Sequence, residues 1–159
     1  MDKDYWEKYY QNHGKDSGIS NHSSFADFCY SDFFRNNHNI KNIVELGSGN
    51  GRDAIYLANK GYKVVAIDQS PSGNSVEIDN MESSVSGEFI SISEDFINYD
   101  YSLINDIDVF YSRFTMHAIS KNDESELLPK ILKYLKVGGL FCICLLYTSD
   151  AADDSLRVD

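Results

Sequence analysis

The sequence contains few cysteines, no long apolar run and no apolar leader, and each shortage excludes a class of protein. Its three cysteines, Cys29, Cys142 and Cys144, include no Cys-x-x-Cys pair, so they predict neither a disulfide framework nor a zinc site. No stretch reaches the roughly 18 apolar residues of a membrane span. The first residues also lack the apolar core of a secretion signal. We therefore expect a cytoplasmic protein with no membrane partner and no metal.

Basic residues are also scarce. Lys and Arg number 14 against 25 Asp and Glu, for a formal net charge of −11, and no basic cluster stands out. Because such a chain repels phosphate backbones on average, nucleic acid is not an expected partner. What the sequence does contain is 159 residues with 42% hydrophobic and 13% aromatic side chains. That is enough for one domain with a single sizeable core.

Apolar patterns along the chain predict alternating strands and helices. The expected strands lie near residues 42–46, 63–67, 88–92, 107–111 and 139–146. The expected helices cover 5–10, 25–34, 52–59, a ragged stretch within 69–86, and 124–135. In the second helix Phe25, Phe28, Cys29 and Phe33 recur at helical spacing and are expected to face a core. Strand, helix and strand in so short a span form a right-handed parallel unit, so the fold class is α/β, with a doubly wound, Rossmann-like sheet.

A glycine turn joins the first strand to the helix that follows it. Gly47, Gly49 and Gly51 alternate there, which suits positive φ angles and the close approach of a ligand to the backbone. The helix start just beyond supplies free N–H groups, so the turn predicts a nucleotide-like ligand. An NAD-type fingerprint needs glycine where this chain has Arg52, and no phosphate-loop Gly-Lys-Ser/Thr follows. An acid, Asp68, stands at the end of the next strand, where it can accept hydrogen bonds from ribose hydroxyls.

These two motifs, residues 44–51 and 65–68, resemble those of the class I S-adenosylmethionine-dependent methyltransferases. The wording through residues 51–61 is most similar to small-molecule enzymes of the tellurite-resistance and thiopurine methyltransferase type. The resemblance covers roughly residues 23–144 and implies a three-layer αβα domain that binds S-adenosylmethionine. Family members normally finish the sheet with two more strands after the fifth, and the sequence leaves no room for them.

The resemblance also implies roles for individual residues. Glu45 would hold the methionine amino group indirectly or through water, Gly47 and Gly49 would admit the ligand, and Asp68 would bind ribose. Asp95 would meet the adenine amine and Phe96 would lie beside the ring; an equally good interpretation makes Asp95 a helix N-cap. The other cofactor-binding residues implied are Ser48, Asn50, Gly51, Gln69 and Ser112.

Catalytic residues are expected after the fourth strand, where ligands meet the carboxyl ends of parallel strands. His117 is a candidate general base for a hydroxyl acceptor on a sugar or other metabolite; a structural histidine that caps the next helix fits equally well. Arg113 is a candidate clamp for an anionic group, although pairing with a surface acid is slightly favoured. Methyl transfer is an in-line displacement that needs alignment more than chemistry. The acceptor is expected to be a small molecule, because the Asn-Pro-Pro-Tyr of amino-methylating nucleic-acid enzymes is absent after the strand.

The last residues, 147–159, change abruptly to small and acidic. Residues 145–153 resemble a peptide translated from sequencing-adapter DNA, so we expect an incomplete methyltransferase domain over 1–146 and a foreign or disordered tail over 147–159. The chain is either an active enzyme or a cofactor-binding fragment without activity, and an NAD-binding domain is less favoured. An incomplete sheet would expose an edge beside residues 140–146.

Overall fold

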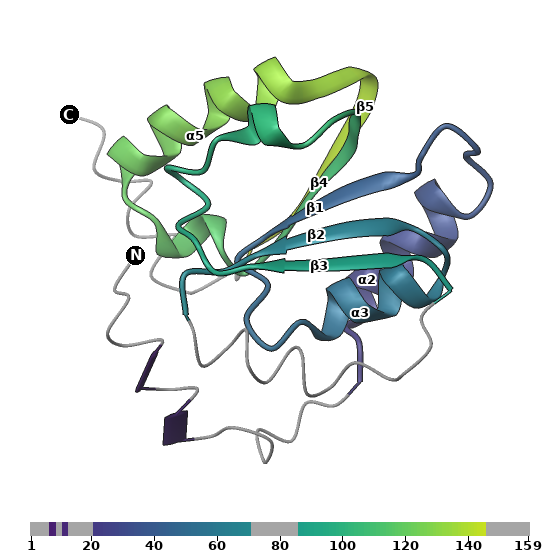
Figure 1. Cartoon of the computed structure of the whole chain (residues 1–159), viewed down its shortest axis with the longest axis horizontal. Helices are drawn as coiled ribbons and strands as arrows, with labels where there is room; N and C mark the ends of the chain where they lie inside the picture. Colours follow the sequence, from purple (N-terminus) through teal and green to yellow (C-terminus); the bar gives the residue numbers. More distant parts are fainter. Residues whose placement is uncertain (1–6, 9–10, 13–20, 71–85, 146–159) are drawn as a thin grey trace, which may run out of the picture.

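The computed structural model describes residues 7–8, 11–12, 21–70 and 86–145, which include one parallel sheet with helices on both faces (Figure 1). Across the sheet the strands run in the order β3-β2-β1-β4-β5, and all neighbours are parallel. The predicted doubly wound α/β fold is therefore confirmed. The strands are β1 (Asn42–Leu46), β2 (Lys63–Ile67), β3 (Glu88–Ile92), β4 (Ile107–Arg113) and β5 (Leu135–Cys144).

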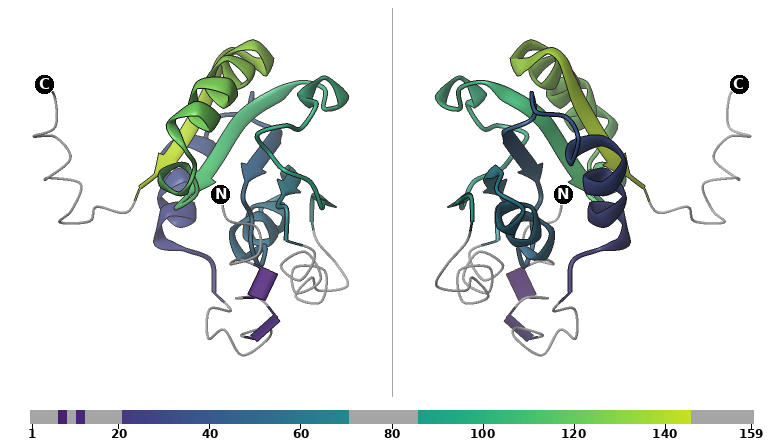
Figure 2. Two further views of the ribbon diagram at one scale, coloured as in Figure 1. Left: turned by 90° about the vertical axis from the view of Figure 1, so that its left-hand side faces the viewer. Right: turned by 90° about the vertical axis from the view of Figure 1, so that its right-hand side faces the viewer.

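The helices form two layers around this sheet. Figures 1 and 2 show α5 (Lys121–Tyr134) on one face, and α2 (Ser24–Cys29) and α3 (Arg52–Asn59) on the other. Shorter helical turns are η1 (Tyr30–Phe34), η2 (Tyr101–Leu103) and η3 (Met116–Ala118). Among the described residues, no helix has both the length and the apolar character that a membrane crossing requires. The segments expected to be helical over 5–10 and 69–86, and the tail over 147–159, lie largely outside the described residues.

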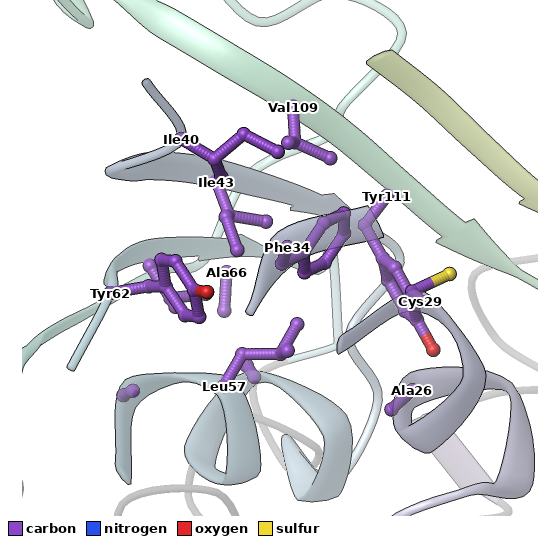
Figure 3. Close-up of a cluster of buried hydrophobic side chains, with 13 residues drawn as sticks. Ala26, Cys29, Phe34, Ile40, Ile43, Leu57, Tyr62, Ala66, Val109 and Tyr111 are labelled. Carbon is purple, nitrogen blue, oxygen red and sulfur yellow. The ribbon is translucent and has the colours of Figure 1, made fainter. Parts of the chain in front are cut away.

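Each face of the sheet carries its own apolar core. The core under α2 and α3 is shown in Figure 3 and includes Phe34, Ile43, Leu57, Val109 and Tyr111. The core under α5 includes Leu46, Ile67, Phe110, Leu127 and Ile131. Because β1, β2 and β4 bury side chains on both faces, they form the buried centre of the sheet.

The helix expected over 25–34 buries a different face from the one predicted. After Cys29 the chain winds into a wider π-helical turn, closed by a 2.8 Å hydrogen bond from Arg35 N to Tyr30 O. This turn brings Phe34 into the core at 1% exposure, whereas Phe28 and Phe33 are 50% and 46% exposed. The predicted apolar face was wrong for those two phenylalanines, because an α-helical period does not hold through a π-helical turn.

The region around α5 also differs from the expected boundaries. The helix begins at Lys121 rather than 124, because Ser120 and Asp123 form a reciprocal capping box, and it continues through Pro129. It runs directly into β5, which starts at Leu135 rather than 139. A bulge between the pairs Ile107–Leu135 and Val109–Leu140 accommodates the extra residues. β5 is an edge strand in the described sheet, and Ile143 on it is 40% exposed.

Candidate functional site

The candidate site lies where the order of the strands reverses, at the carboxyl ends of β1, β2 and β4. The glycine turn leaves β1 there with Gly47, Gly49 and Gly51 at φ angles of 71°, 61° and 71°, all in the left-handed region. Gly51 is also the N-cap of α3. The turn therefore requires glycine for its backbone conformation, as the alternating pattern predicted.

Gly47 is also fixed by a neighbouring side chain. A Cβ atom built on it would lie 2.6 Å from Cγ2 and 2.7 Å from Oγ1 of Thr115, which follows β4. Real Cβ contacts are never this short, so an alanine would displace Thr115 or the turn. The close approach that excludes a side chain at Gly47 thus comes from the protein itself.

Asp68, at the end of β2, faces the same turn. Its Oδ2 accepts a 2.9 Å hydrogen bond from Gly49 N and its Oδ1 a 2.8 Å bond from Ser70 N. The side chain is buried, and burial raises the pKa of this carboxyl despite those two N–H donors, with the Glu7 carboxylate adding to the rise. The Ser70 hydroxyl donates to Glu7 at 2.8 Å. Two acids therefore lie at this strand end, and Asp68 holds the middle of the glycine turn.

Three predicted cofactor residues carry buried polar atoms that the described part of the chain leaves without a hydrogen-bond partner. These atoms are Ser48 Oγ, Gln69 Nε2 and Ser112 Oγ, each at the end of a different central strand. An unpaired buried polar group costs about 1–3 kcal/mol, so these atoms are candidates to pair with a bound ligand. Ser112 is completely enclosed, which leaves Ser48 and Gln69 as the atoms better placed to meet a ligand.

Glu45 is a second buried acid of the site, at 4% exposure on β1. It pairs in register with Tyr111 on β4, so the two side chains leave the sheet on the same face. Burial, followed by the charges of Glu45 and Asp53, raises the pKa of the Tyr111 hydroxyl well above its usual range. The tyrosine therefore stays protonated, and its hydroxyl donates a 2.8 Å hydrogen bond to Asp53.

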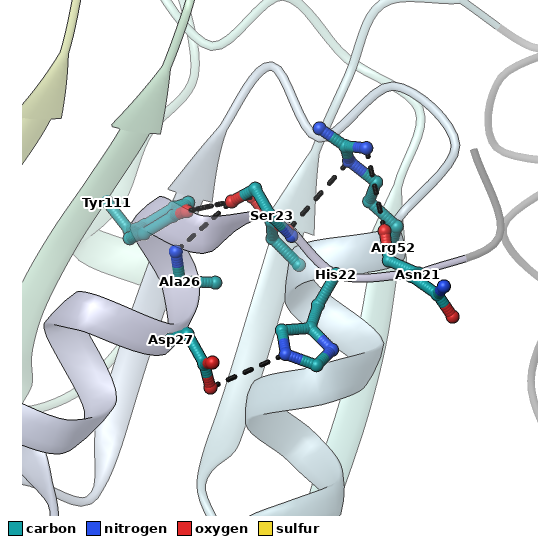
Figure 4. Close-up of polar contacts among 8 residues, drawn as sticks. Asn21, His22, Ser23, Ala26, Asp27, Arg52 and Tyr111 are labelled. Atoms are coloured by element: carbon teal, nitrogen blue, oxygen red, sulfur yellow. Dashed lines mark hydrogen bonds and ion pairs between the residues drawn. The ribbon is translucent and has the colours of Figure 1, made fainter.

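Asp53 was not predicted from the sequence, yet it is one of the most highly connected side chains at this end of the sheet. It sits in the first turn of α3 at 3% exposure and accepts hydrogen bonds from Ser23 and Tyr111. Figure 4 shows Ser23 beside the Tyr111 hydroxyl, with Arg52 and Asn21 on its other side. The sequence does place this acid on the buried side of an amphipathic helix, but a search for apolar periodicity alone disregards a single charged residue there.

The predicted adenine contacts are placed differently from one another. Asp95 caps a turn: its Oδ1 accepts from Ile97 N at 3.0 Å and its Oδ2 from Asn98 at 2.7 Å. No regular α-helix starts there, so the N-cap alternative holds only in the form of a turn cap. Phe96 is completely buried in the core under α5. Its side chain is fully covered in this structure, and its expected place beside adenine stays a prediction.

The candidate catalytic residues gather around one phenyl ring after β4. The Arg113 guanidinium lies 4.0 Å from the centroid of the Phe114 ring, and the His117 ring is 6.3 Å away from it, edge to face. Phe114 itself has a φ of 58°, an unusual conformation for a phenylalanine. Among the described residues Arg113 forms no ion pair with an acid, so neither its pairing with a surface acid nor its role as a clamp is decided here. His117 is exposed and lies in η3, while Ser120 caps α5, so the capping alternative for His117 was wrong.

The opposite end of the sheet carries a cavity whose buried acid is already fully hydrogen-bonded by the chain. A cavity of about 380 Å³ opens at the amino ends of β1, β4 and β5. Its buried acid, Asp108, already accepts 2.9 Å hydrogen bonds from Lys41 N, Asn42 N and the Lys136 ammonium. Within the described ranges, no group of three potential metal ligands occurs at either end.

Comparisons with known proteins point to one family. The family model described as a methyltransferase domain matches residues 43–139, which include the glycine turn, Asp68 and the segment after β4. No curated protein sequence matches the chain significantly.

Solved structures with this fold include several methyltransferases. The chain is similar to the glycopeptide N-methyltransferase MtfA complexed with S-adenosyl-L-methionine (TM-score 0.67, 17% identity, 81% of this chain and 56% of that one). It is similar to phosphoethanolamine N-methyltransferase 1 of Haemonchus contortus (0.67, 18%, 89% and 30%). A third is an rRNA methylase from Streptococcus thermophilus (0.57, 21%, 76% and 72%). The chain thus spans little more than half of the first protein and less than a third of the second, and the low identities show the fold alone.

Proposed function

Because this chain belongs to the methyltransferase-domain family, we propose that it binds S-adenosylmethionine at the carboxyl ends of β1, β2 and β4 and takes part in methyl transfer to a small molecule. The observation that carries the proposal is the glycine turn held by Asp68, with unpaired buried polar atoms on Ser48 and Gln69 beside it. Structural neighbours crystallised with S-adenosylmethionine or its demethylated product support the choice of cofactor.

The residues present suit each part of this cofactor. Asp68 is an acceptor at the strand end where ribose hydroxyls would donate, and the Gln69 amide lies next to it in the chain. The buried charge of Glu45 suits the positive methionine end, and Asn50 belongs to the turn between them. Asp95 remains a candidate for the adenine amine. No pyrophosphate-binding fingerprint is present, which favours a nucleoside with a charged sulfonium over a dinucleotide.

S-adenosylmethionine supplies an activated methyl group when bound. The protein's part is then to align the acceptor, exclude water and take up a proton. His117 is exposed after β4 and has a suitable side chain to accept the proton of a hydroxyl acceptor. Arg113, stacked on Phe114 and without an acidic partner among the described residues, is placed to receive an anionic part of the acceptor.

The finer assignment is to small-molecule enzymes of the tellurite-resistance and thiopurine type, with a hydroxyl on a sugar or other metabolite as the acceptor. One alternative keeps the cofactor site but not the activity, because this chain covers little more than half of MtfA. The neighbours that act on glycopeptides and on phosphoethanolamine make a small or peptide-like acceptor the first class to screen.

Calorimetric titration with S-adenosylmethionine, S-adenosylhomocysteine and NAD tests the proposal. We expect both adenosyl ligands to bind and NAD not to bind, and we expect Asp68→Ala to weaken both. Binding without release of S-adenosylhomocysteine across a panel of hydroxyl acceptors would favour the inactive alternative. If the chain turns over, His117→Ala should slow the reaction while His38→Ala, an exposed histidine at the opposite end of the sheet, should not. Equal rates for the two variants would remove His117 from the chemistry.

A further inference from the structure

A buried carboxylate ties three separate segments together behind the glycine turn. Asp53 Oδ1 accepts a 2.6 Å hydrogen bond from Ser23 N, and its Oδ2 accepts 2.7 Å from Ser23 Oγ and 2.8 Å from the Tyr111 hydroxyl. Ser23 is the N-cap of α2, Tyr111 belongs to β4, and Asp53 is in the first turn of α3. One side chain therefore fixes the relative positions of two helices and a central strand.

Only a carboxylate satisfies this arrangement fully. The three groups that face Asp53 are all donors, and an ionised aspartate offers acceptors alone. An asparagine would point an N–H₂ group at one of them and leave a buried donor unpaired. The Arg52 guanidinium adds a charge 3.9 Å from Asp53 Oδ1 and lies 3.5 Å from Asn21 O, a further link to the segment before α2.

The glycine turn lies between this cluster and Asp68. Its first half is held by Ile67 O, which accepts from Gly47 N at 2.8 Å, and by Asp68, which accepts from Gly49 N at 2.9 Å. Its second half ends at Gly51, the N-cap of α3, two residues before Asp53. A carboxylate thus restrains the turn from each side, one directly and one through the first turn of α3.

We propose that Asp53 is a positioning residue that keeps the glycine turn in its cofactor-binding shape by tying the start of α3 to Ser23 and Tyr111. The proposal rests on the proposed function, because the turn is taken to bind S-adenosylmethionine. Asp53 acts on the turn through the start of α3 and is not proposed to contact the cofactor. Its loss should act on the turn and leave unchanged the far end of the β2–β3 ladder, where Val64 pairs with Phe89.

The test compares Asp53→Asn with Asp27→Asn. Asp27 is a matched control, since it also accepts a hydrogen bond from a tyrosine hydroxyl, 2.6 Å from Tyr56, but on the exposed face of α2. We expect Asp53→Asn to weaken S-adenosylhomocysteine binding about tenfold, the factor associated with one lost buried hydrogen bond, and Asp27→Asn to change it less than about twofold. Tyr111→Phe, which removes one donor and keeps the ring, should give a smaller loss and serves if Asp53→Asn does not fold.

Amide hydrogen exchange separates this proposal from the proposed function. Asp53→Asn or Tyr111→Phe should speed exchange at Gly51 N, which donates to Ser48 O at 3.0 Å, and leave exchange at Val64, near the opposite end of β2, unchanged. That readout needs no cofactor. A wild-type chain that binds neither adenosyl ligand would refute the proposed function, whereas unchanged exchange at Gly51 in both variants would overturn the role of Asp53. A uniform rise in exchange across the sheet would also overturn it, because it would show a general structural role.

Discussion

Replacing Gly47 by alanine should destabilise the protein more than replacing a glycine with the same kind of backbone but open surroundings. Gly61 provides that control: its φ is 95°, and nothing lies within 4 Å of a Cβ built on it. Gly47 has a φ of 71° and would place its Cβ 2.6 Å from Thr115 Cγ2. The two variants share the conformational cost and differ in the clash.

The magnitudes follow from these two contributions. An L-residue in the left-handed region costs about 1–2 kcal/mol, which is the whole expected effect of Gly61→Ala. Overpacking a buried site adds about 1–3 kcal/mol, so Gly47→Ala should lose roughly 2–5 kcal/mol in the free energy of unfolding. Thr115→Ala removes both clashing atoms, although it also removes the 3.2 Å bond from Thr115 Oγ1 to Arg113 O.

Urea unfolding followed by circular dichroism measures all four proteins, the two single alanine variants at Gly47 and Gly61, Thr115→Ala, and the Gly47/Thr115 double variant. The double variant should be more stable than the sum of its single losses by about 1–3 kcal/mol, because relief of the clash couples the two sites. Strict additivity, or a Gly61→Ala loss as large as that of Gly47→Ala, would refute the packing explanation.

Three further predictions follow from the charged and thiol groups. Burial raises the pKa of Asp68, so cofactor affinity measured by calorimetry should fall as the pH drops through a value above the ordinary aspartate range. Asp68→Asn should bind the cofactor weakly, with an affinity that does not depend on pH. A wild-type affinity that stays constant down to about pH 4 would contradict this prediction. Burial opposes but does not prevent the lowering of the Asp108 pKa by the Asn42 N–H, Lys136 and the Lys41 N–H. Asp108 therefore contributes stability above its unfolded pKa that is lost as the pH falls through its lower folded pKa, and Lys136→Met should shrink the acid-induced loss measured by urea midpoints; an unchanged loss would show that the ion pair adds nothing. A hydrogen bond from Cys29 lowers the pKa of the half-buried Cys142 thiol and outweighs the effect of burial. Iodoacetamide should therefore label Cys142 before Cys29, as followed by peptide mass spectrometry. The reverse order of labelling would be inconsistent with this contact.

Local patterns predicted the parts of the fold that depend on local chemistry. The strand at 42–46 and the one at 63–67 appear with the predicted bounds, because β-branched runs bounded by turn residues leave little choice. The glycine turn could be predicted because alternating glycines indicate positions where φ must be positive. The sequence also contains the capping box of Ser120 and Asp123. The predicted start of α5 was nevertheless too late, because its apolar pattern begins after the first turn.

Contacts between distant segments could not be predicted in this way. Asp53 meets Ser23 across 30 positions and Tyr111 across 58, and no single-segment pattern brings these residues together. The family resemblance implied a place beside adenine for Phe96, but its complete burial under α5, next to Tyr101, depends on contacts between separate segments that the sequence does not reveal. The Arg113 guanidinium lies 4.0 Å from the centroid of the Phe114 ring, and Phe114 has a φ of 58°. No pattern in the sequence predicts this contact or this backbone conformation.

A titration with S-adenosylhomocysteine, followed by amide chemical shifts in nuclear magnetic resonance, locates the binding site on the chain directly. We predict saturable shifts at Gly49, Gly51 and Gln69, at the carboxyl ends of β1 and β2, and none at Gly138 or Gly139 beside the cavity at the opposite end of the sheet. Saturable shifts confined to Gly138 and Gly139, or no shifts at a saturating concentration of the ligand, would contradict this prediction.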